Sequence, residues 1–174
     1  MIESEYLKNL VAKAKKLQKT IVLPEGEDER ILKAAHIIAE EEAANLVILG
    51  DETEIKNYFA QNNWSMNRIS IVAPETSPKL EEYANLLYEL RKAKGMTPED
   101  ARKIARDANY FGTLMVKAGD ADGMLSGANH STADTVRPAL QIIKSAHKDR
   151  GVSAALISVK DGEAYLLSDC AVVI

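Results

Sequence analysis

Short apolar runs alternate with stretches of helical periodicity through the first 143 residues, and this alternation constrains the fold more than any other feature. The runs are rich in β-branched residues, and most of them end beside a proline or glycine, as buried strands do. They are Thr20–Leu23, Asn45–Gly50, Ile69–Val72 and Gly123–Leu125. Strands separated by helices commonly pair in parallel and are covered on both faces. We therefore expect an α/β fold with three layers, in which a largely parallel sheet carries helices on both faces.

The helical stretches carry apolar residues at spacings of three and four. The first covers residues 3–17, and we expect its apolar stripe to be buried: Tyr6, Leu7, Leu10, Val11, Ala14 and Leu17. The second has a stripe formed by Ile31, Ala34, Ala35, Ile38 and Ala39. Further helices are expected at residues 54–59, 78–94, 110–118 and 139–143, and one begins at Thr97 with Pro98 in its first position.

The pattern changes after Gly151. Two apolar runs, residues 152–159 and 164–167, flank Asp161-Gly162, a pair that is typical of a tight β-hairpin. We therefore expect a first α/β domain at residues 1–150, without its C-terminal return, and the opening hairpin of an incomplete second domain at residues 151–174. Residues 170–174 form an apolar run with neither cap nor polar tail, so we expect either that something covers them or that the chain is cut.

Charge and cysteine content narrow the classes of function. The net charge of −4 gives no general attraction for nucleic acid or membrane, so an anion site must be local. The one cysteine, Cys170, excludes an internal disulfide and suits a reducing compartment. No run has transmembrane length, and the acidic residues after Met1 do not form a secretory leader. We expect a cytoplasmic protein without nucleic-acid or membrane partners.

Residues 123–138, GMLSGANHSTADTVRP, concentrate the unusual residues of the chain. The apolar run opens into Ser126-Gly127, and the glycine lets the backbone approach a ligand closely. Polar residues then precede or enter a helical pattern: Asn129, His130, Ser131, Thr132, Asp134, Thr135 and Arg137. Backbone N–H groups that are free at such a junction, together with hydroxyls and an arginine, suit a phosphate or a carboxylate. Ligands also gather beyond the carboxyl ends of parallel strands. This segment therefore predicts an anion site.

The candidate cations and the histidine each have a plainer interpretation. The planar guanidinium of Arg137 matches phosphate oxygens, but Arg137 could instead pair with Asp134 on an exposed helix face. Arg91 lies near the end of a long helix, where a solvated basic residue is favoured by the helix dipole. His130 could act as an acid or base at neutral pH, or could be a hydrogen-bonded structural histidine.

The small polar residues are also open to two interpretations. Ser126 and Gly127 could present a hydroxyl and backbone N–H groups to a ligand, whereas a nucleophilic serine is disfavoured because no Ser-His-acid arrangement can be traced. Any of Ser131, Thr132 and Thr135 could be an ordinary helix cap. The carboxylates of residues 24–27, PEGE, would repel phosphate, so we interpret this segment as a turn. We interpret Asp122 as a group that orients the loop after it.

Five segments, in the same order along the chain, resemble the phosphate acetyltransferase and phosphate butyryltransferase family, and they look closest to its acetyl-transferring members. The segments are residues 20–26 with Arg30, 88–95, 110–112, 122–130 and 134–144. Five matching blocks over nearly the whole chain are far more specific than one motif.

The resemblance implies an enzyme that reversibly transfers an acetyl group between CoA and phosphate by direct attack in a ternary complex. It also implies a fold like that of isocitrate and isopropylmalate dehydrogenases, with a cleft between two α/β domains, of which this chain holds most of the first. CoA and acetyl-CoA are substrates, as are phosphate and acetyl phosphate, and neither a metal nor a bound cofactor is implied. The family tends to form homodimers.

Carried onto this sequence, the resemblance makes Arg137 and Ser126 the catalytic candidates. It assigns substrate binding to Arg91, Gly127, His130, Ser131, Thr132 and Thr135. Two other functions stay open: an inactive remnant that only binds phosphate or a partner subunit, and a butyryl-transferring enzyme with a roomier pocket.

Overall fold

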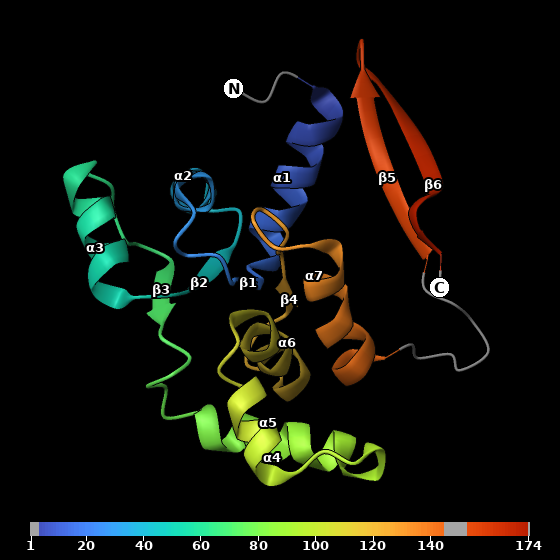
Figure 1. Cartoon of the computed structure of the whole chain (residues 1–174). Helices are drawn as coiled ribbons and strands as arrows, with labels where there is room; N and C mark the ends of the chain where they lie inside the picture. Colours follow the sequence, from blue (N-terminus) through green and yellow to red (C-terminus); the bar gives the residue numbers. More distant parts are fainter. Residues whose placement is uncertain (1–3, 145–152, 174) are drawn as a thin grey trace.

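A computed structural model describes residues 4–144 and 153–173, and it shows an α/β arrangement with a small separate hairpin (Figure 1). Four parallel strands form one sheet in the order β3-β2-β1-β4. They are β1 (Thr20–Leu23), β2 (Asn45–Leu49), β3 (Ile69–Val72) and β4 (Gly123–Met124). The four apolar runs are thus confirmed as strands of a parallel sheet.

The helices occupy the stretches between the strands, as the periodicity predicts. They are α1 (Glu5–Leu17), α2 (Glu29–Glu40), α3 (Glu52–Gln61), α4 (Leu80–Arg91), α5 (Pro98–Ile104), α6 (Ala108–Ala118) and α7 (Thr132–Pro138). A 3₁₀ turn, Lys92–Lys94, extends α4, and a π-helical turn, Ala139–Ile143, extends α7. Thr97 caps α5 by accepting a hydrogen bond from the N–H of Asp100, with Pro98 in the first turn as expected.

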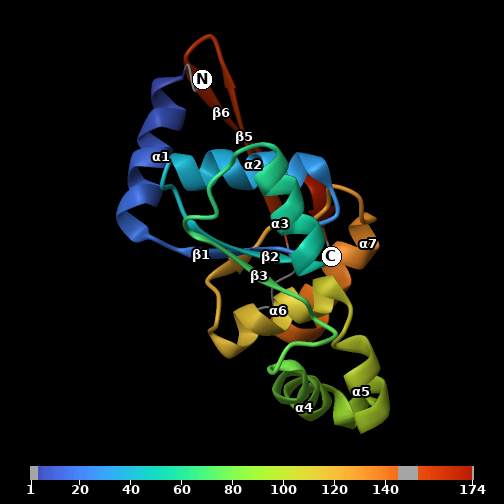
Figure 2. The same cartoon turned by 90° about the vertical axis from the view of Figure 1, so that its left-hand side faces the viewer.

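Both faces of the sheet are covered because the strand residues alternate between two apolar clusters. Val22, Val47 and Leu49 pack with buried residues of α4, α5 and α6. Leu23 and Ile48 face the other way and pack with α2 and α3. Figures 1 and 2 show the sheet between these two groups of helices. The prediction of helices on both faces is therefore confirmed.

Helix α6 packs closely against the sheet through a glycine. A Cβ atom built on Gly112 would lie 2.7 Å from Sδ of Met124 and 3.1 Å from Cγ1 of Val22. Both distances are shorter than ordinary van der Waals contact, so a side chain at this position would force Met124 or the helix to shift. This close approach holds α6 directly over β1 and β4.

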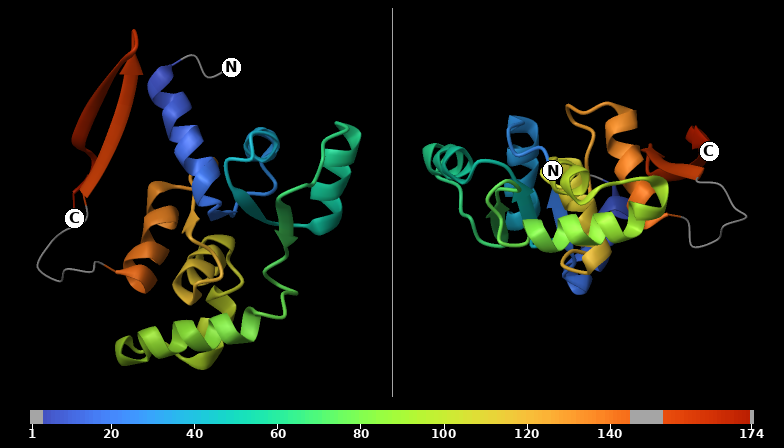
Figure 3. Two further views of the ribbon diagram at one scale, coloured as in Figure 1. Left: turned by 180° about the vertical axis from the view of Figure 1, so that it is seen from behind. Right: turned by 60° about the horizontal axis from the view of Figure 1, so that its bottom comes forward.

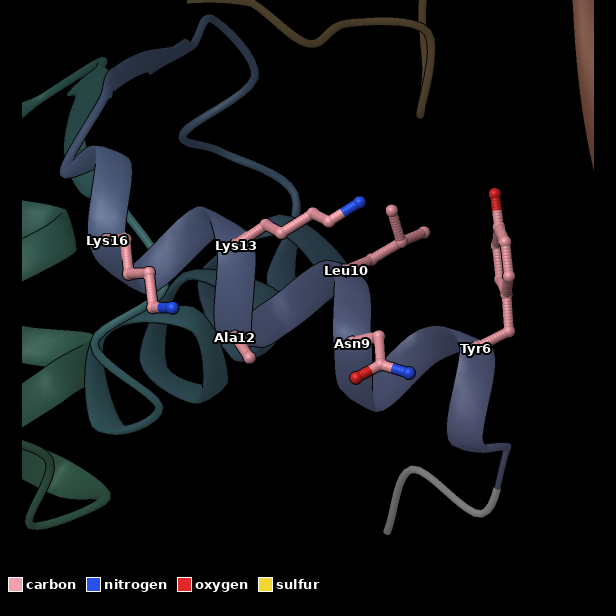
Figure 4. Close-up of a pocket in the computed structure, with 6 residues that line it drawn as sticks. All are labelled: Tyr6, Asn9, Leu10, Ala12, Lys13 and Lys16. Carbon is pink, nitrogen blue, oxygen red and sulfur yellow. The ribbon is translucent and has the colours of Figure 1, made fainter.

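The expectation of a buried stripe on α1 is wrong for the described residues, since none of them is fully buried in this helix. Leu7, Leu10 and Leu17 are 40–64% exposed. Figure 4 shows a hollow on α1 that is lined by side chains of this helix alone, including Tyr6, Leu10 and Lys13. The amphipathic pattern correctly predicts a helix here, but it does not predict what covers its apolar side.

The hairpin forms as the Asp-Gly pair predicts. Strands β5 (Ser153–Lys160) and β6 (Glu163–Val173) are antiparallel, and both turn residues have positive φ, 53° at Asp161 and 84° at Gly162. Figure 3 shows the hairpin beside the α/β layers. The expected domain boundary falls within residues 145–152, which lie outside the described residues, and so does the side chain of Cys170.

The strand order creates a switch point between β1 and β4. The chain leaves β1 into α2, which covers one face, and leaves β4 toward α7 and the π-helical turn, where Ile142 joins the cluster on the other face. The loops after these two strands therefore diverge at the carboxyl edge of the sheet, which is where α/β proteins bind ligands.

Candidate active site

The loops after β1 and β4 meet around the carboxylate of Glu25, which is fully buried. Its Oε2 accepts hydrogen bonds from the backbone N–H groups of Gly127 and Ala128, each at 3.0 Å. Its Oε1 accepts from the N–H groups of Asn129 at 2.9 Å and His130 at 3.1 Å, and Nδ1 of His130 lies 2.8 Å from the same oxygen. Loop 127–130 is therefore an anion cradle that an internal carboxylate occupies.

This occupancy corrects two expectations. The N–H groups of loop 127–130 are not free for a ligand, because all four donate to Glu25. We interpret residues 24–27 as a polar turn from the sequence, but the Glu25 side chain of this segment binds loop 127–130. Burial alone would raise its pKa, but the hydrogen bonds from Asn129, Ala128 and His130 outweigh burial and lower the pKa to about 2. The carboxylate is therefore ionised at neutral pH and can only accept hydrogen bonds.

Ser126 lies at the carboxyl end of β4 and is half-buried beside α6. Its hydroxyl donates to Oδ1 of Asn109 at 2.7 Å. Asn109 is 1% exposed, and its Nδ2 is buried with no hydrogen-bond partner among the described residues, as is Oγ1 of Thr135. A Cβ built on Gly127, whose φ is 112°, would lie 3.9 Å from that Thr135 oxygen. Unsatisfied polar atoms thus gather beside Ser126 and Gly127.

Arg91 and Arg137 act on the same phenol although 46 residues separate them in sequence. Burial raises the pKa of Tyr110, the carboxylate of Asp107 adds to the rise, and the positive charges of Arg137 and Arg91 oppose it. The Tyr110 hydroxyl donates to Oε1 of Gln141 at 3.0 Å. Neither arginine pairs with a described carboxylate, and the half-buried Arg91 has an unpartnered buried Nε. Both predicted cations are therefore close enough to Tyr110 to act on its charge, one from α4 and one from α7.

The plainer interpretation holds for Ser131. Ser131 caps α7 by accepting from the N–H of Asp134 at 3.2 Å, and its hydroxyl donates to Oδ2 of Asp134 at 2.6 Å. Asp134 is therefore engaged with Ser131 and does not pair with Arg137, which stays exposed. Thr132 is also exposed, in the first turn of this helix.

A cavity of about 430 Å³ adjoins Ser126 and Thr135. Its remaining walls are mostly apolar and come from β4, α7 and the turn after it: Met124, Leu125, Val136, Ala139, Leu140, Ile143 and Lys144. A cavity with a few polar groups at one end and apolar walls elsewhere is typical of small-molecule sites.

Asp122 does not orient the candidate site. Its carboxylate accepts from Nζ of Lys19 at 2.6 Å and from the N–H of Thr20 at 2.9 Å. These contacts lie at the amino end of β1, at the opposite edge of the sheet from Ser126. Asp122 therefore ties the starts of β1 and β4 together.

Among the side chains that the structure describes, no three or more histidines, cysteines or acidic residues come together as a metal site would require. No helix in the described part of the chain is long and apolar enough to cross a membrane.

Sequence reasoning missed Glu25, Asn109 and Tyr110 as residues of this site. Glu25 lies two residues after the end of a buried strand, at the carboxyl edge of the sheet, which was a usable signal, but its negative charge argued against it. Asn109 and Tyr110 lie side by side on α6, and no spacing in the sequence indicates that they face Ser126 and the two arginines.

Comparisons with known proteins agree with this architecture. The sequence model of the family described as "Phosphate acetyl/butaryl transferase" matches residues 5–174. The chain is 44% identical to a phosphate acetyltransferase of Helicobacter pylori over 97% of this chain and 32% of that protein. It is 47% identical to one of Clostridium acetobutylicum over 91% of this chain and 50% of that protein.

Solved structures give the same result. An EutD phosphotransacetylase from Staphylococcus aureus superposes with a TM-score of 0.82 at 39% identity, over 95% of this chain and 51% of that one. A phosphotransacetylase from Streptococcus pyogenes gives 0.84 at 38% identity, over 95% and 52%. The chain spans about a third to a half of the length of the relatives that it matches. The family resemblance is confirmed: the chain belongs to the phosphate acetyl/butyryl transferase family.

Proposed function

We propose that this chain carries the phosphate-facing part of a phosphate acetyltransferase site, which interconverts acetyl-CoA and phosphate with acetyl phosphate and CoA. The observation that carries the proposal is that Arg91 and Arg137 both act on Tyr110 while neither arginine forms an ion pair with a described carboxylate. Uncompensated guanidinium groups suit a multiply charged phosphate. The names of the relatives support acetyl over butyryl as the transferred group.

The reaction depends on positive charges placed beside the leaving phosphate more than on a bound cofactor. The thiol of CoA gives up its proton, and the thiolate sulfur attacks the acetyl carbonyl of acetyl phosphate. The carbon–oxygen bond to phosphate breaks, the electron pair leaves with phosphate, and the proton passes to solvent or to the released phosphate. Negative charge grows on that oxygen, so Arg137 and Arg91 stabilise the transition state more than the ground state. Ser126 and Thr135 supply hydroxyls beside the cavity, whose apolar walls suit the uncharged arm of CoA.

We extend the proposal to the overall architecture, the assembly and the location of the protein. The overall architecture is of the isocitrate and isopropylmalate dehydrogenase type, with the site completed by a second α/β domain. The active form is a homodimer. The protein works in the cytoplasm, for which the single cysteine is the supporting observation.

Turnover and binding measured on the 174-residue chain test the proposal. Acetyl phosphate formation from acetyl-CoA and phosphate above the protein-free rate supports it directly. Calorimetric binding of acetyl phosphate without turnover supports the alternative, a phosphate-binding module without catalysis. If neither turnover nor binding of acetyl phosphate or CoA occurs, and adding the remaining segment of the Clostridium acetobutylicum relative restores neither, the proposal is wrong.

A further inference from the structure

We propose that Glu25 is a positioning residue of the candidate site: it fills the anion cradle of loop 127–130 from inside the protein and fixes His130 with the ring hydrogen on Nδ1. The proposal rests on the proposed function for the reaction that the loop serves. The geometry that it invokes can be measured without substrate.

The contacts of Glu25 join two loops that are distant in sequence. Its carboxylate reaches residues 102 to 105 positions further along the chain and receives four backbone N–H groups. Two further contacts reinforce this junction. Nη2 of Arg30 donates to the carbonyl oxygen of Ala128 at 2.6 Å, and Nδ2 of Asn129 donates to Oε1 of Glu27 at 2.8 Å.

The arrangement requires an anion. Successive N–H groups that point at one spot form an anion-binding nest, and a neutral isostere of glutamate would place an amide N–H₂ among them. A buried charge is tolerated only when hydrogen bonds compensate it, and here every hydrogen bond to the Glu25 side chain comes from the one loop, while the positive charge of Arg30 also acts on it. An internal carboxylate therefore keeps phosphate out of the backbone cradle. Substrate contacts then fall to the side chains of Ser126, Thr135, Arg91 and Arg137.

The same carboxylate determines the tautomer of His130. Because ionised Glu25 can only accept, the Nδ1 atom that lies 2.8 Å from it must carry hydrogen. Nε2 has no hydrogen-bond partner among the described residues, and the side chain is 27% exposed. In the neutral ring, Nε2 is thus the nitrogen that can accept a hydrogen bond from a substrate thiol or phosphate hydroxyl.

Nitrogen NMR of the histidine rings tests the proposal on the 174-residue chain without ligand. At a pH where the ring is neutral, His130 is expected to show hydrogen on Nδ1, and the amides of residues 127–130 are expected to be protected from exchange. Glu25→Gln is expected to lose the Nδ1 signature and to accelerate exchange of these amides about tenfold or more. Glu25→Asp keeps the charge and should restore part of both signals.

Glu27→Gln is the matched control, because Glu27 is a neighbouring carboxylate that touches the same loop only through Asn129. It should leave the His130 tautomer unchanged. If Glu25→Gln does not fold, the wild-type spectrum still decides: hydrogen on Nε2 in wild type overturns the proposal. A Glu25→Gln variant that folds and still carries the ring hydrogen on Nδ1 of His130 also overturns the proposal. A chain that binds no acetyl phosphate but keeps the wild-type signature contradicts only the proposed function.

Discussion

Two arginines and one buried carboxylate carry most of the electrostatics of the candidate site, and each has a different environment. Glu25 is fully buried, and its carboxylate is compensated by hydrogen bonds from the protein, so its charge is not available to a ligand. Arg91 and Arg137 have no described carboxylate partner and act on Tyr110. We therefore expect an anion to bind on the arginine side of the site and not at the glycine-containing loop.

Replacing Arg137 removes one of these cations. In the preparation that catalyses acetyl transfer, Arg137→Ala should lower kcat/KM by about 30- to 1000-fold, which corresponds to about 2–4 kcal/mol of lost transition-state stabilisation. Steady-state assays with acetyl-CoA and phosphate measure this effect. Arg102→Ala is the control, since Arg102 is an exposed residue of α5 that pairs with Glu81. An unchanged kcat/KM in Arg137→Ala would exclude Arg137 from the site.

Glu25 makes stability depend on pH in acid. Its pKa is about 2 when folded against 4.5 for a model carboxyl group, so its contribution is complete above pH 4.5 and is lost as the pH falls toward 2. The shift corresponds to about 3 kcal/mol in the free energy of unfolding. Denaturant titrations from pH 7 to pH 2 should therefore show a steeper loss for wild type than for Glu25→Gln. Parallel curves would contradict the assignment.

Helix α6 is the element that connects the fold to the site. Its inner face packs on β1 and β4 through Gly112. In its first turn, Asn109 accepts from the Ser126 hydroxyl and Tyr110 lies within the electrostatic influence of the arginines. The tight packing at Gly112 therefore determines where the polar residues of the preceding turn, Asn109 and Tyr110, lie. A shift of α6 away from the sheet would move Asn109 and Tyr110 together.

A methyl group on Gly112 tests this coupling. Gly112→Ala would place a Cβ 2.7 Å from Sδ of Met124, and overpacking of this kind costs about 1–3 kcal/mol of unfolding free energy. Lys117→Ala, at an exposed position on the same helix, should change stability by less than about 0.5 kcal/mol. Thermal and denaturant unfolding measure both variants. Equal stability of Gly112→Ala and wild type would show that the helix moves without cost.

Within the described residues, the chain has a well-packed α/β body and apolar side chains that remain exposed, among them two groups outside the candidate site. One group lies on α1, at Leu7, Leu10 and Leu17. The other lies on the β5–β6 hairpin and includes Leu156, Ile157, Tyr165, Leu166 and Leu167, each 48–70% exposed. Apolar surface contributes to stability only where it is removed from water, so these side chains add little to the stability of the chain as described.

Substitutions in the two environments should therefore differ sharply. Leu10→Ser on α1 should change the free energy of unfolding by less than about 0.5 kcal/mol. Leu114→Ala removes a fully buried side chain of α6 and should lower it by about 2–5 kcal/mol. Guanidinium unfolding of both variants measures the difference. A loss of more than about 2 kcal/mol in Leu10→Ser would show that α1 is covered in solution.

Local patterns predict the elements well because they depend on near neighbours. Ile69–Val72 is a strand at the predicted residues, Thr97 and Pro98 begin a helix as expected, and Asp161-Gly162 forms the turn of the hairpin. The parallel sheet with helices on both faces follows from the order of these elements. Turn conformation, helix capping and apolar periodicity are properties of a few adjacent residues, so the chain order is enough to read them.

Local sequence patterns could not predict the contacts between distant segments of the chain. The cradle formed by residues 127–130 looks open to phosphate in the sequence, and Glu25 fills it only because β1 and β4 are neighbours in the sheet. The joint effect of Arg91 and Arg137 on Tyr110 depends equally on how α4, α6 and α7 pack. Residue types and spacing establish which chemical groups are present. Folding determines which charges are neutralised inside the protein and which remain for a ligand, because electrostatic and hydrogen-bond energies depend on distance in space and not along the chain.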